Sequence, residues 1–129
     1  VMEAGKVGFK PGMYMAACDE LYLTVKGKGG HAALPDQYNN PIMIVSELLP
    51  KLESYLKSLS EGTSPYVFAF GSLQADGATN VIPEVVEAKG TLRTMDESWR
   101  SIVHEKLERF VSEFLKDKNA QGQLRIAKG

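Results

Sequence analysis

The sequence has few of the residues that cross-link a protein or anchor it in a membrane. It contains one cysteine, Cys18, so no internal disulfide can form. No stretch approaches the roughly 20 consecutive apolar residues of a membrane-spanning helix, and the N-terminal residues lack the apolar segment of a signal peptide. We therefore expect a protein that has no membrane partner and works in the cytoplasm.

An excess of charge of one sign and groups of metal-binding residues are also missing. The 15 basic and 16 acidic residues give a net charge of -1, so no overall field attracts nucleic acid. Only two histidines are present, His31 and His104, and neither belongs to a His-x-Asp or His-Glu-x-x-His pair. There is no Gly-x-Ser-x-Gly elbow either. The sequence therefore predicts no nucleic-acid partner, no metal site, no cofactor and no independent catalyst in this chain.

What the chain does contain fits one globular domain. It has 129 residues, 43% of them apolar and 24% charged, which is an ordinary balance for a single packed core. Residues 1–19 have no clear period and are broken by glycine and proline, so we interpret them as a connector. Residues 20–129 carry regular patterns and form the expected domain. Within it, apolar and polar residues alternate over 20–26, which predicts a strand with one buried face.

Apolar residues at helical spacing predict two helices. The first begins at the Asn40 cap, followed by Pro41 at the first helical position. The second follows the Asp96 cap, and its buried stripe is predicted to comprise Trp99, Ile102, Val103, Leu107, Phe110, Val111 and Phe114. His104 is assigned to the polar side of this helix and is predicted to be a solvated surface residue. Further strands are predicted over residues 66–73, 82–94 and 123–127.

The predicted order is strand, helix, strand, strand, helix, strand. This order is typical of a ferredoxin-like sandwich, an α+β fold with two helices on one face of a four-stranded antiparallel sheet (βαββαβ). The other face of the sheet and its edge strands stay free for a partner. Arg93 falls on the polar face of its strand, opposite to the apolar Leu92.

A glycine-rich turn leads to the first histidine. Gly27, Gly29 and Gly30 precede His31 and give more backbone freedom than an ordinary turn requires. This freedom would let the loop approach a ligand or a second chain closely. The phosphate-binding P-loop pattern is not present. A structural turn that carries an ordinary loop histidine is the alternative interpretation.

Two separate segments resemble the M20 amidohydrolases, which include N-acyl amino acid, hippurate and indole-acetyl amino acid hydrolases. Gly27–Pro35 has the sequence Gly-Lys-Gly-Gly-His-Ala-Ala-Leu-Pro, which is similar to a motif of this family. Gly77–Pro83, with the sequence Gly-Ala-Thr-Asn-Val-Ile-Pro, and Gly90–Thr94, with Gly-Thr-Leu-Arg-Thr, resemble a later motif. The opening Gly5–Gly12 looks like the connector of the family. Together the resemblance covers nearly the whole chain.

The resemblance implies that the chain is the dimerisation and lid domain of a zinc-dependent amidohydrolase that hydrolyses N-acyl amino acids or peptides. Two zinc ions, or similar divalent metals, would be bound by a catalytic domain whose residues lie on either side of the lid. The lid would pair with a second copy to form a homodimer. In isolation the chain would be inactive.

The resemblance also implies roles for individual residues. The residue that matches His31 reaches into the active site of the partner and stabilises the oxyanion of the tetrahedral intermediate. Asn80 matches an amide donor near the same end of the substrate, and Arg93 matches an arginine that binds the substrate carboxylate. Gly29 and Gly30 are expected to shape the loop. A turn residue at Asn80 and a plain sheet-face arginine at Arg93 are the alternatives.

Fold alone does not fix the function, because the ferredoxin-like architecture hosts many activities. The alternative to a lid domain is a free-standing small-molecule-binding regulatory module. An RNA-binding sheet is a third possibility, but it requires a basic surface, and a net charge of -1 does not favour one.

Overall fold

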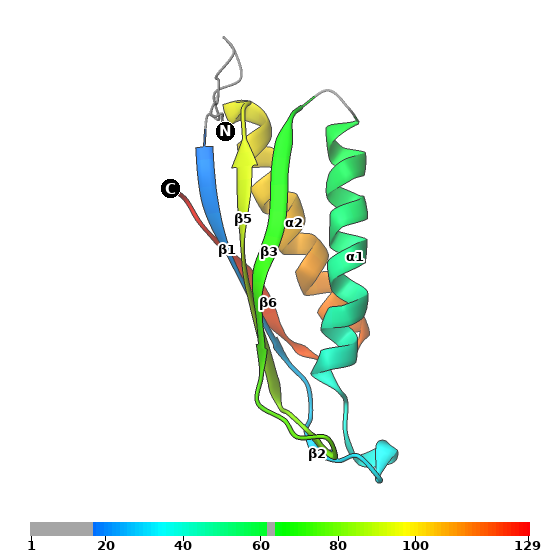
Figure 1. The fold of residues 1–129 in the computed structure, drawn as a ribbon. Coiled ribbons are helices and arrows are strands. Elements are labelled where there is room, and N and C mark those ends of the chain that lie inside the picture. Colours follow the sequence, from blue (N-terminus) through cyan, green and yellow to red (C-terminus); the bar gives the residue numbers. More distant parts are fainter. Residues whose placement is uncertain (1–16, 62–63) are drawn as a thin grey trace.

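The structure is a computed structural model that describes residues 17–61 and 64–129. Two helices cover one face of a four-stranded sheet, and a two-stranded sheet lies beyond one end of it (Figure 1). In chain order the elements are β1 (Ala17–Lys26), β2 (Gly30–His31), the 3-10 helix η1 (Pro35–Gln37), α1 (Pro41–Ser60), β3 (Tyr66–Ala75), β4 (Val81–Ile82), β5 (Val85–Thr94), α2 (Glu97–Asp117) and β6 (Gln121–Ala127).

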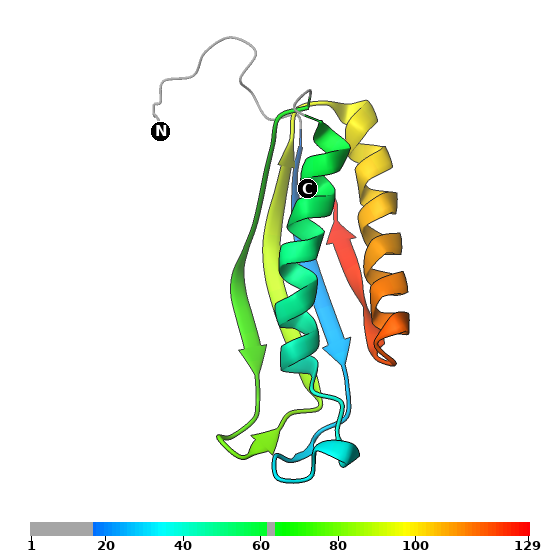
Figure 2. The same cartoon turned by 90° about the vertical axis from the view of Figure 1, so that its right-hand side faces the viewer.

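The main sheet confirms the predicted fold class. Its strand order is β3-β5-β1-β6, and every neighbouring pair is antiparallel. The helix α1 connects β1 to β3, and α2 connects β5 to β6. Figure 2 shows both helices along the same face of the sheet. The chain is therefore an α+β ferredoxin-like sandwich, with β3 and β6 as its open edges.

The first strand begins earlier than the apolar pattern predicted. Ala17 and Asp19 are buried, whereas Cys18 and Glu20 are exposed, so the alternation of β1 extends back to Ala17. The buried carboxylate of Asp19 interrupts the apolar pattern, and for this reason the pattern did not predict the start of the strand. The last three residues of the connector expected over 1–19 belong to β1, and the rest of that connector lies outside the described residues.

The strand predicted over residues 82–94 is divided into two. Val81–Ile82 forms β4 and pairs with β2, while Val85–Thr94 forms β5 in the main sheet. Pro83 lies between them and has no backbone N–H to donate to a ladder. The break at Pro83 separates the two-stranded sheet from the main one.

The core lies between the sheet and the two helices. Its largest fully buried side chains are Leu21, Leu23, Val25, Val45, Leu48, Leu52, Leu56, Val86, Leu92, Leu107 and Leu115. The strands β1 and β5 and the helices α1 and α2 supply them, so the chain has a hydrophobic core of its own, which is what an independently folding domain requires. Within the described part of the chain, neither helix is long and apolar enough to cross a membrane.

The stripe predicted for α2 is partly wrong. Val103, Leu107 and Val111 are fully buried as predicted, but Ile102 is 52% exposed. The buried face includes His104 in its place. His104 follows Ile102 by two residues, about 200° around the helix, and therefore lies beside Val111 at the opposite edge of the predicted stripe.

Both predicted helix caps are present. The Asn40 side chain accepts a hydrogen bond from the Ile42 N–H at 3.0 Å, ahead of Pro41 at the first helical position. The Asp96 side chain accepts hydrogen bonds from the N–H groups of residues 98 and 99. These caps fix where each helix starts and therefore how the preceding loop enters it.

Candidate functional site

The glycine-rich turn after β1 packs tightly against two other segments. A Cβ atom at Gly27 would lie 2.1 Å from the carbonyl oxygen of Asn39, and one at Gly29 would lie 2.5 Å from that of Ile82. Both distances are too short for a real Cβ, so any other residue would force the backbone to shift. Between them, Lys28 and Asn39 exchange two backbone hydrogen bonds of 2.8 Å. The turn therefore has a defined backbone position.

The strands β2 and β4 bring the two sequence motifs together. His31 in β2 is paired with Val81 in β4, and the Ala32 N–H donates to the carbonyl oxygen of Asn80 at 3.0 Å. His31 and Asn80 are both exposed. Two of the three predicted site residues thus lie at the same end of the molecule, His31 in the small sheet at the lower end of Figure 1 and Asn80 in the turn that precedes β4.

The ring of His31 has a hydrogen bond on one nitrogen. Its Nδ1 accepts from the N–H of Ala33 at 3.1 Å. A backbone N–H can only donate, so Nδ1 carries no proton, and in the neutral imidazole the proton lies on Nε2. His31 therefore presents an exposed N–H donor, which can interact with an oxygen atom that gains negative charge.

Arg93 lies at the other end of the main sheet. It is exposed in β5, where its register partners are Cys18 in β1 and Val67 in β3. In Figure 1 the arrowhead of β5 lies at the end opposite to β2. Arg93 is eight residues beyond Val85, which corresponds to about 26 Å along an extended strand. Within one chain, Arg93 is therefore not brought together with His31 and Asn80.

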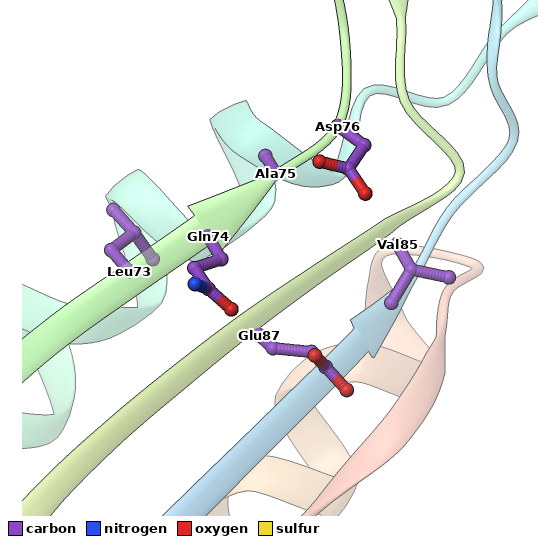
Figure 3. A pocket seen from close by; sticks show the side chains of 6 residues that line it. All are labelled: Leu73, Gln74, Ala75, Asp76, Val85 and Glu87. Carbon is purple, nitrogen blue, oxygen red and sulfur yellow. The ribbon is translucent and has the colours of Figure 1, made fainter.

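An open pocket of about 630 Å³ lies where β3 and β5 approach the small sheet. Gln74 extends from β3 toward β5, and Glu87 extends from β5 toward β1 (Figure 3). The pocket is lined by Leu73, Gln74, Ala75, Asp76, Val85 and Glu87. These side chains include two carboxylates and no basic group, so this pocket does not suit the carboxylate of a substrate.

A buried polar cluster joins β1 to α2 at the Arg93 end of the sheet, and sequence patterns did not reveal it. Asp19 is fully buried, and its two carboxylate oxygens accept from Arg100 at 2.6 and 3.1 Å. The ring of His104 lies 2.7 Å from one of these oxygens, and the Gly129 N–H donates to the other at 3.1 Å. An ionised carboxylate only accepts, so His104 Nε2 carries the proton of this bond.

The prediction that His104 is a solvated surface residue is therefore wrong. Its exposed fraction is 7%. The sequence held a usable signal, because His104 precedes Leu107 by three residues and Val111 by seven, at helical spacing on the same face. A polar residue in such a stripe is buried when another element supplies a partner, and Asp19 is that partner.

The family model of the M20 dimerisation domain, described as a peptidase dimerisation domain, matches residues 19–119. The chain belongs to this family. The description names dimer formation as the role of the domain, which favours a dimerisation domain over a free-standing regulatory module.

Curated relatives of the chain are named as hydrolases of N-acylated amino acids. The chain is 34% identical over 128 residues to an N-acyl-L-amino acid amidohydrolase of Geobacillus stearothermophilus, covering 99% of this chain and 35% of the relative. It is 30% identical to an N-acetylcysteine deacetylase of Bacillus subtilis, covering 96% of this chain and 33% of the relative. The chain therefore spans about a third of the length of these relatives.

Solved structures support the fold. A crystal structure described as that of an aminohydrolase from methicillin-resistant Staphylococcus aureus matches with a TM-score of 0.80 at 23% identity, over 86% of this chain and 30% of that one. An aminobenzoyl-glutamate utilization protein from Klebsiella pneumoniae matches with a TM-score of 0.67 at 20% identity, over 88% and 28%. At these identities the likeness shows the shared fold.

The Asp19 cluster predicts a pH dependence of stability. Burial alone would raise the pKa of the Asp19 carboxyl, but hydrogen bonds from Arg100, the Gly129 N–H and His104 outweigh it and hold the pKa below its ordinary value. The folded state thus binds this proton less readily than the unfolded state. The stabilisation is complete above the unfolded-state pKa of about 3.9 and is lost as the pH falls through the lower folded-state pKa.

Asp19→Asn should therefore lower the free energy of unfolding by about 3 kcal/mol at neutral pH, because Arg100 loses its buried partner and keeps only the exposed carboxylate of Glu97. It should also reduce the fall in stability on acidification from about pH 5 to pH 2. Urea unfolding followed by circular dichroism at several pH values measures both effects. Asp36→Asn, at an exposed carboxylate in η1, is the control. Parallel pH profiles for wild type and Asp19→Asn would contradict the assignment.

Proposed function

We propose that the chain is the dimerisation and lid domain of a longer, metal-dependent amidohydrolase that cleaves N-acyl amino acids. The relatives named as amidohydrolases and deacetylases of such compounds support the substrate class. The observation that carries the proposal is the β2–β4 pairing, which puts His31 and Asn80 at one end of the domain. The isolated chain should not turn over substrate. Chelator-sensitive amidase activity of the purified chain would contradict this view.

The metal ions of the reaction, two zinc ions by the family resemblance, belong to parts of the longer protein outside this chain. His31 accepts an N–H at Nδ1, and His104 is buried against Asp19. Among residues 17–61 and 64–129, no three His, Cys, Asp or Glu side chains form a group that could hold a metal ion. The residues present do not fit a metal pair. The cytoplasmic setting stays a prediction.

His31 contributes a hydrogen-bond donor to the reaction. When water attacks an amide carbonyl, negative charge develops on the carbonyl oxygen. The Nε2–H of a neutral His31 can donate to this oxygen, because the Ala33 N–H already occupies Nδ1. A donor that is in place before the reaction needs no reorganisation at the transition state. Asn80 supplies an amide at the same end of the domain.

The separation of Arg93 from His31 supports action across a dimer. About 26 Å of strand separates Arg93 from Val85, at the His31 end of β5, which is far more than the length of a small N-acyl amino acid. A two-fold axis perpendicular to the sheet pairs identical edge strands antiparallel. The Arg93 end of one copy then lies beside the His31 end of the other. One substrate can therefore contact Arg93 of one subunit and the His31 loop of its partner.

The open edge of β3 is the surface for this dimer. The strand β3 has 10 residues, whereas β6, at the other open edge, has 7. Exposed apolar side chains lie beside it: Leu73 is 58% exposed, and Ile42 of α1 is 39% exposed. Leu73 and Ile42 line the same hollow. An unpaired strand with adjacent apolar groups is suited to pairing with a second copy.

The dimer surface can be tested on the chain itself. Leu73→Lys puts a charge at the β3 edge. It should raise the dissociation constant of the dimer at least tenfold, because an unpaired charge in an interface is costly to desolvate. Analytical ultracentrifugation should give twice the chain mass of 14.2 kDa for wild type and a larger monomer fraction for the variant. Ile102→Lys, on exposed α2 surface, is the control. A wild-type monomer, or equal dissociation in all three, would refute this surface.

The role of His31 is tested in the longer protein. His31→Ala should lower kcat by about a hundred- to a thousandfold, as expected for the loss of one oxyanion donor. Metal content and dimer formation should stay unchanged. A mixed dimer of this variant with a variant lacking the metal site should regain activity, because one of its two sites is then intact. Absence of such recovery, despite proven subunit exchange, would argue against action across the dimer.

Arg93 is tested by changing the substrate together with the enzyme. Arg93→Ala should raise KM by about ten- to a hundredfold for an N-acyl amino acid, because a charge-assisted pair of hydrogen bonds is lost. For the matching N-acyl amine, which has no carboxylate, wild type and Arg93→Ala should have similar kcat/KM. Arg93→Lys is the control, because it keeps the positive charge but cannot form two parallel hydrogen bonds to a carboxylate. An equal loss with both substrates would mean that Arg93 does not bind the carboxylate.

A further inference from the structure

One peptide group connects His31 to a tyrosine that the motif resemblance does not include. The peptide between Ala32 and Ala33 has its N–H directed at His31 Nδ1, at 3.1 Å. The carbonyl oxygen of the same peptide accepts from the Tyr38 hydroxyl at 3.3 Å. In a trans peptide the N–H and C=O point in opposite directions. Tyr38 and His31 therefore lie at the two ends of a single hydrogen-bonded unit.

Tyr38 is itself held in place. The chain passes through η1 after the His31 turn and returns, so that Tyr38 is half-buried against Gly30. A Cβ at Gly30 would lie 3.5 Å from Tyr38 Cβ, an ordinary contact distance. The next residue, Asn39, exchanges backbone hydrogen bonds with Lys28, and its side-chain amide donates to the Lys118 carbonyl at 2.9 Å. The tyrosine is thus anchored to the end of β1 and to the end of α2.

We propose that Tyr38 is a positioning residue for His31 and acts through the peptide between Ala32 and Ala33. The Tyr38 hydroxyl holds the carbonyl end of this peptide, which keeps the N–H end aimed at Nδ1. Hydrogen bonds in such a chain polarise one another, so the bond at the carbonyl strengthens the N–H as a donor. The inference rests on the proposed role of His31 as a donor.

The consequence is that the neutral His31 ring keeps a single tautomer. With Nδ1 occupied, the neutral imidazole keeps its proton on Nε2. Without the Tyr38 hydroxyl the peptide can rotate, and His31 can take the other tautomer, in which Nε2 has a lone pair. That form would repel the negative charge that develops on the substrate oxygen. Loss of the hydroxyl should therefore lower kcat and leave KM nearly unchanged, because the affected interaction forms in the transition state.

The ring state can be measured directly on this chain, which has a core of its own. A long-range proton–nitrogen correlation spectrum shows both nitrogens of each imidazole, and the chain has only two histidines. The spectrum is recorded at about pH 8, where ordinary imidazoles are neutral. Wild type should show His31 with Nε2 protonated. Tyr38→Phe, which keeps the ring against Gly30, should shift His31 toward a mixture of tautomers. Tyr55→Phe, on α1 against Phe110, is the matched control.

Turnover of the longer protein provides the second measurement. Tyr38→Phe should lower kcat by about three- to tenfold, the effect of one neutral hydrogen bond, with KM unchanged. Tyr55→Phe should leave both constants unchanged. An unchanged His31 spectrum in Tyr38→Phe would overturn the proposal. A changed spectrum with unchanged kcat would instead overturn the catalytic role of His31, which separates failure of this inference from failure of the proposed function.

Discussion

The pairing of β2 with β4 is the constraint on which the rest of the candidate site depends. Its hydrogen bonds run between backbone groups, so they set the relative position of His31 and Asn80 whatever the neighbouring side chains are. Glycine at position 29 permits the close approach, because a Cβ there would collide with the backbone of Ile82. Pro83 then ends β4 and returns the chain to the main sheet. Two motifs that are far apart in the sequence become one surface.

The length of the main sheet is a second constraint, and the motifs alone could not reveal it. The resemblance implies that His31 acts in the active site of the partner, but it does not say how far Arg93 lies from His31 and Asn80 within one chain. The fold separates Arg93 from the other two by most of the length of β5. A two-fold axis is the simplest operation that brings opposite ends of two identical sheets together. With the roles proposed for these three residues, one substrate can reach all of them only where two copies of the chain meet, which agrees with the dimerisation named in the family description.

Most of the fold could be predicted because burial produces a visible period. The alternation in β5, with Leu92 buried and Arg93 exposed, is present in the sequence. The burial of Asp19 could not be predicted in this way. His104 lies at helical spacing to Leu107 and Val111, but nothing in its own helix shows the partner that lets it be buried, which is Asp19. The period of apolar residues shows which face of one helix or strand packs against the core. It does not show which polar side chains of two different elements form a pair. The errors at the start of β1 and on the face of α2 both come from this one contact.

The His31 loop is held without being buried, and this determines how it can work. Its residues are exposed or half-buried and none is fully buried, so the hydrophobic effect contributes little, and each hydrogen bond that water can replace adds only about 0.5–1.5 kcal/mol. A chain of bonds from Tyr38 through one peptide to His31 compensates in part, because the members support one another. In the proposed dimer a partner subunit would cover the loop and exclude water, and the same bonds would then act in a lower dielectric and be stronger. Dimer formation would then do two things for the site. It would bring His31 and Arg93 to the same substrate, and it would strengthen the hydrogen bonds that orient the His31 donor.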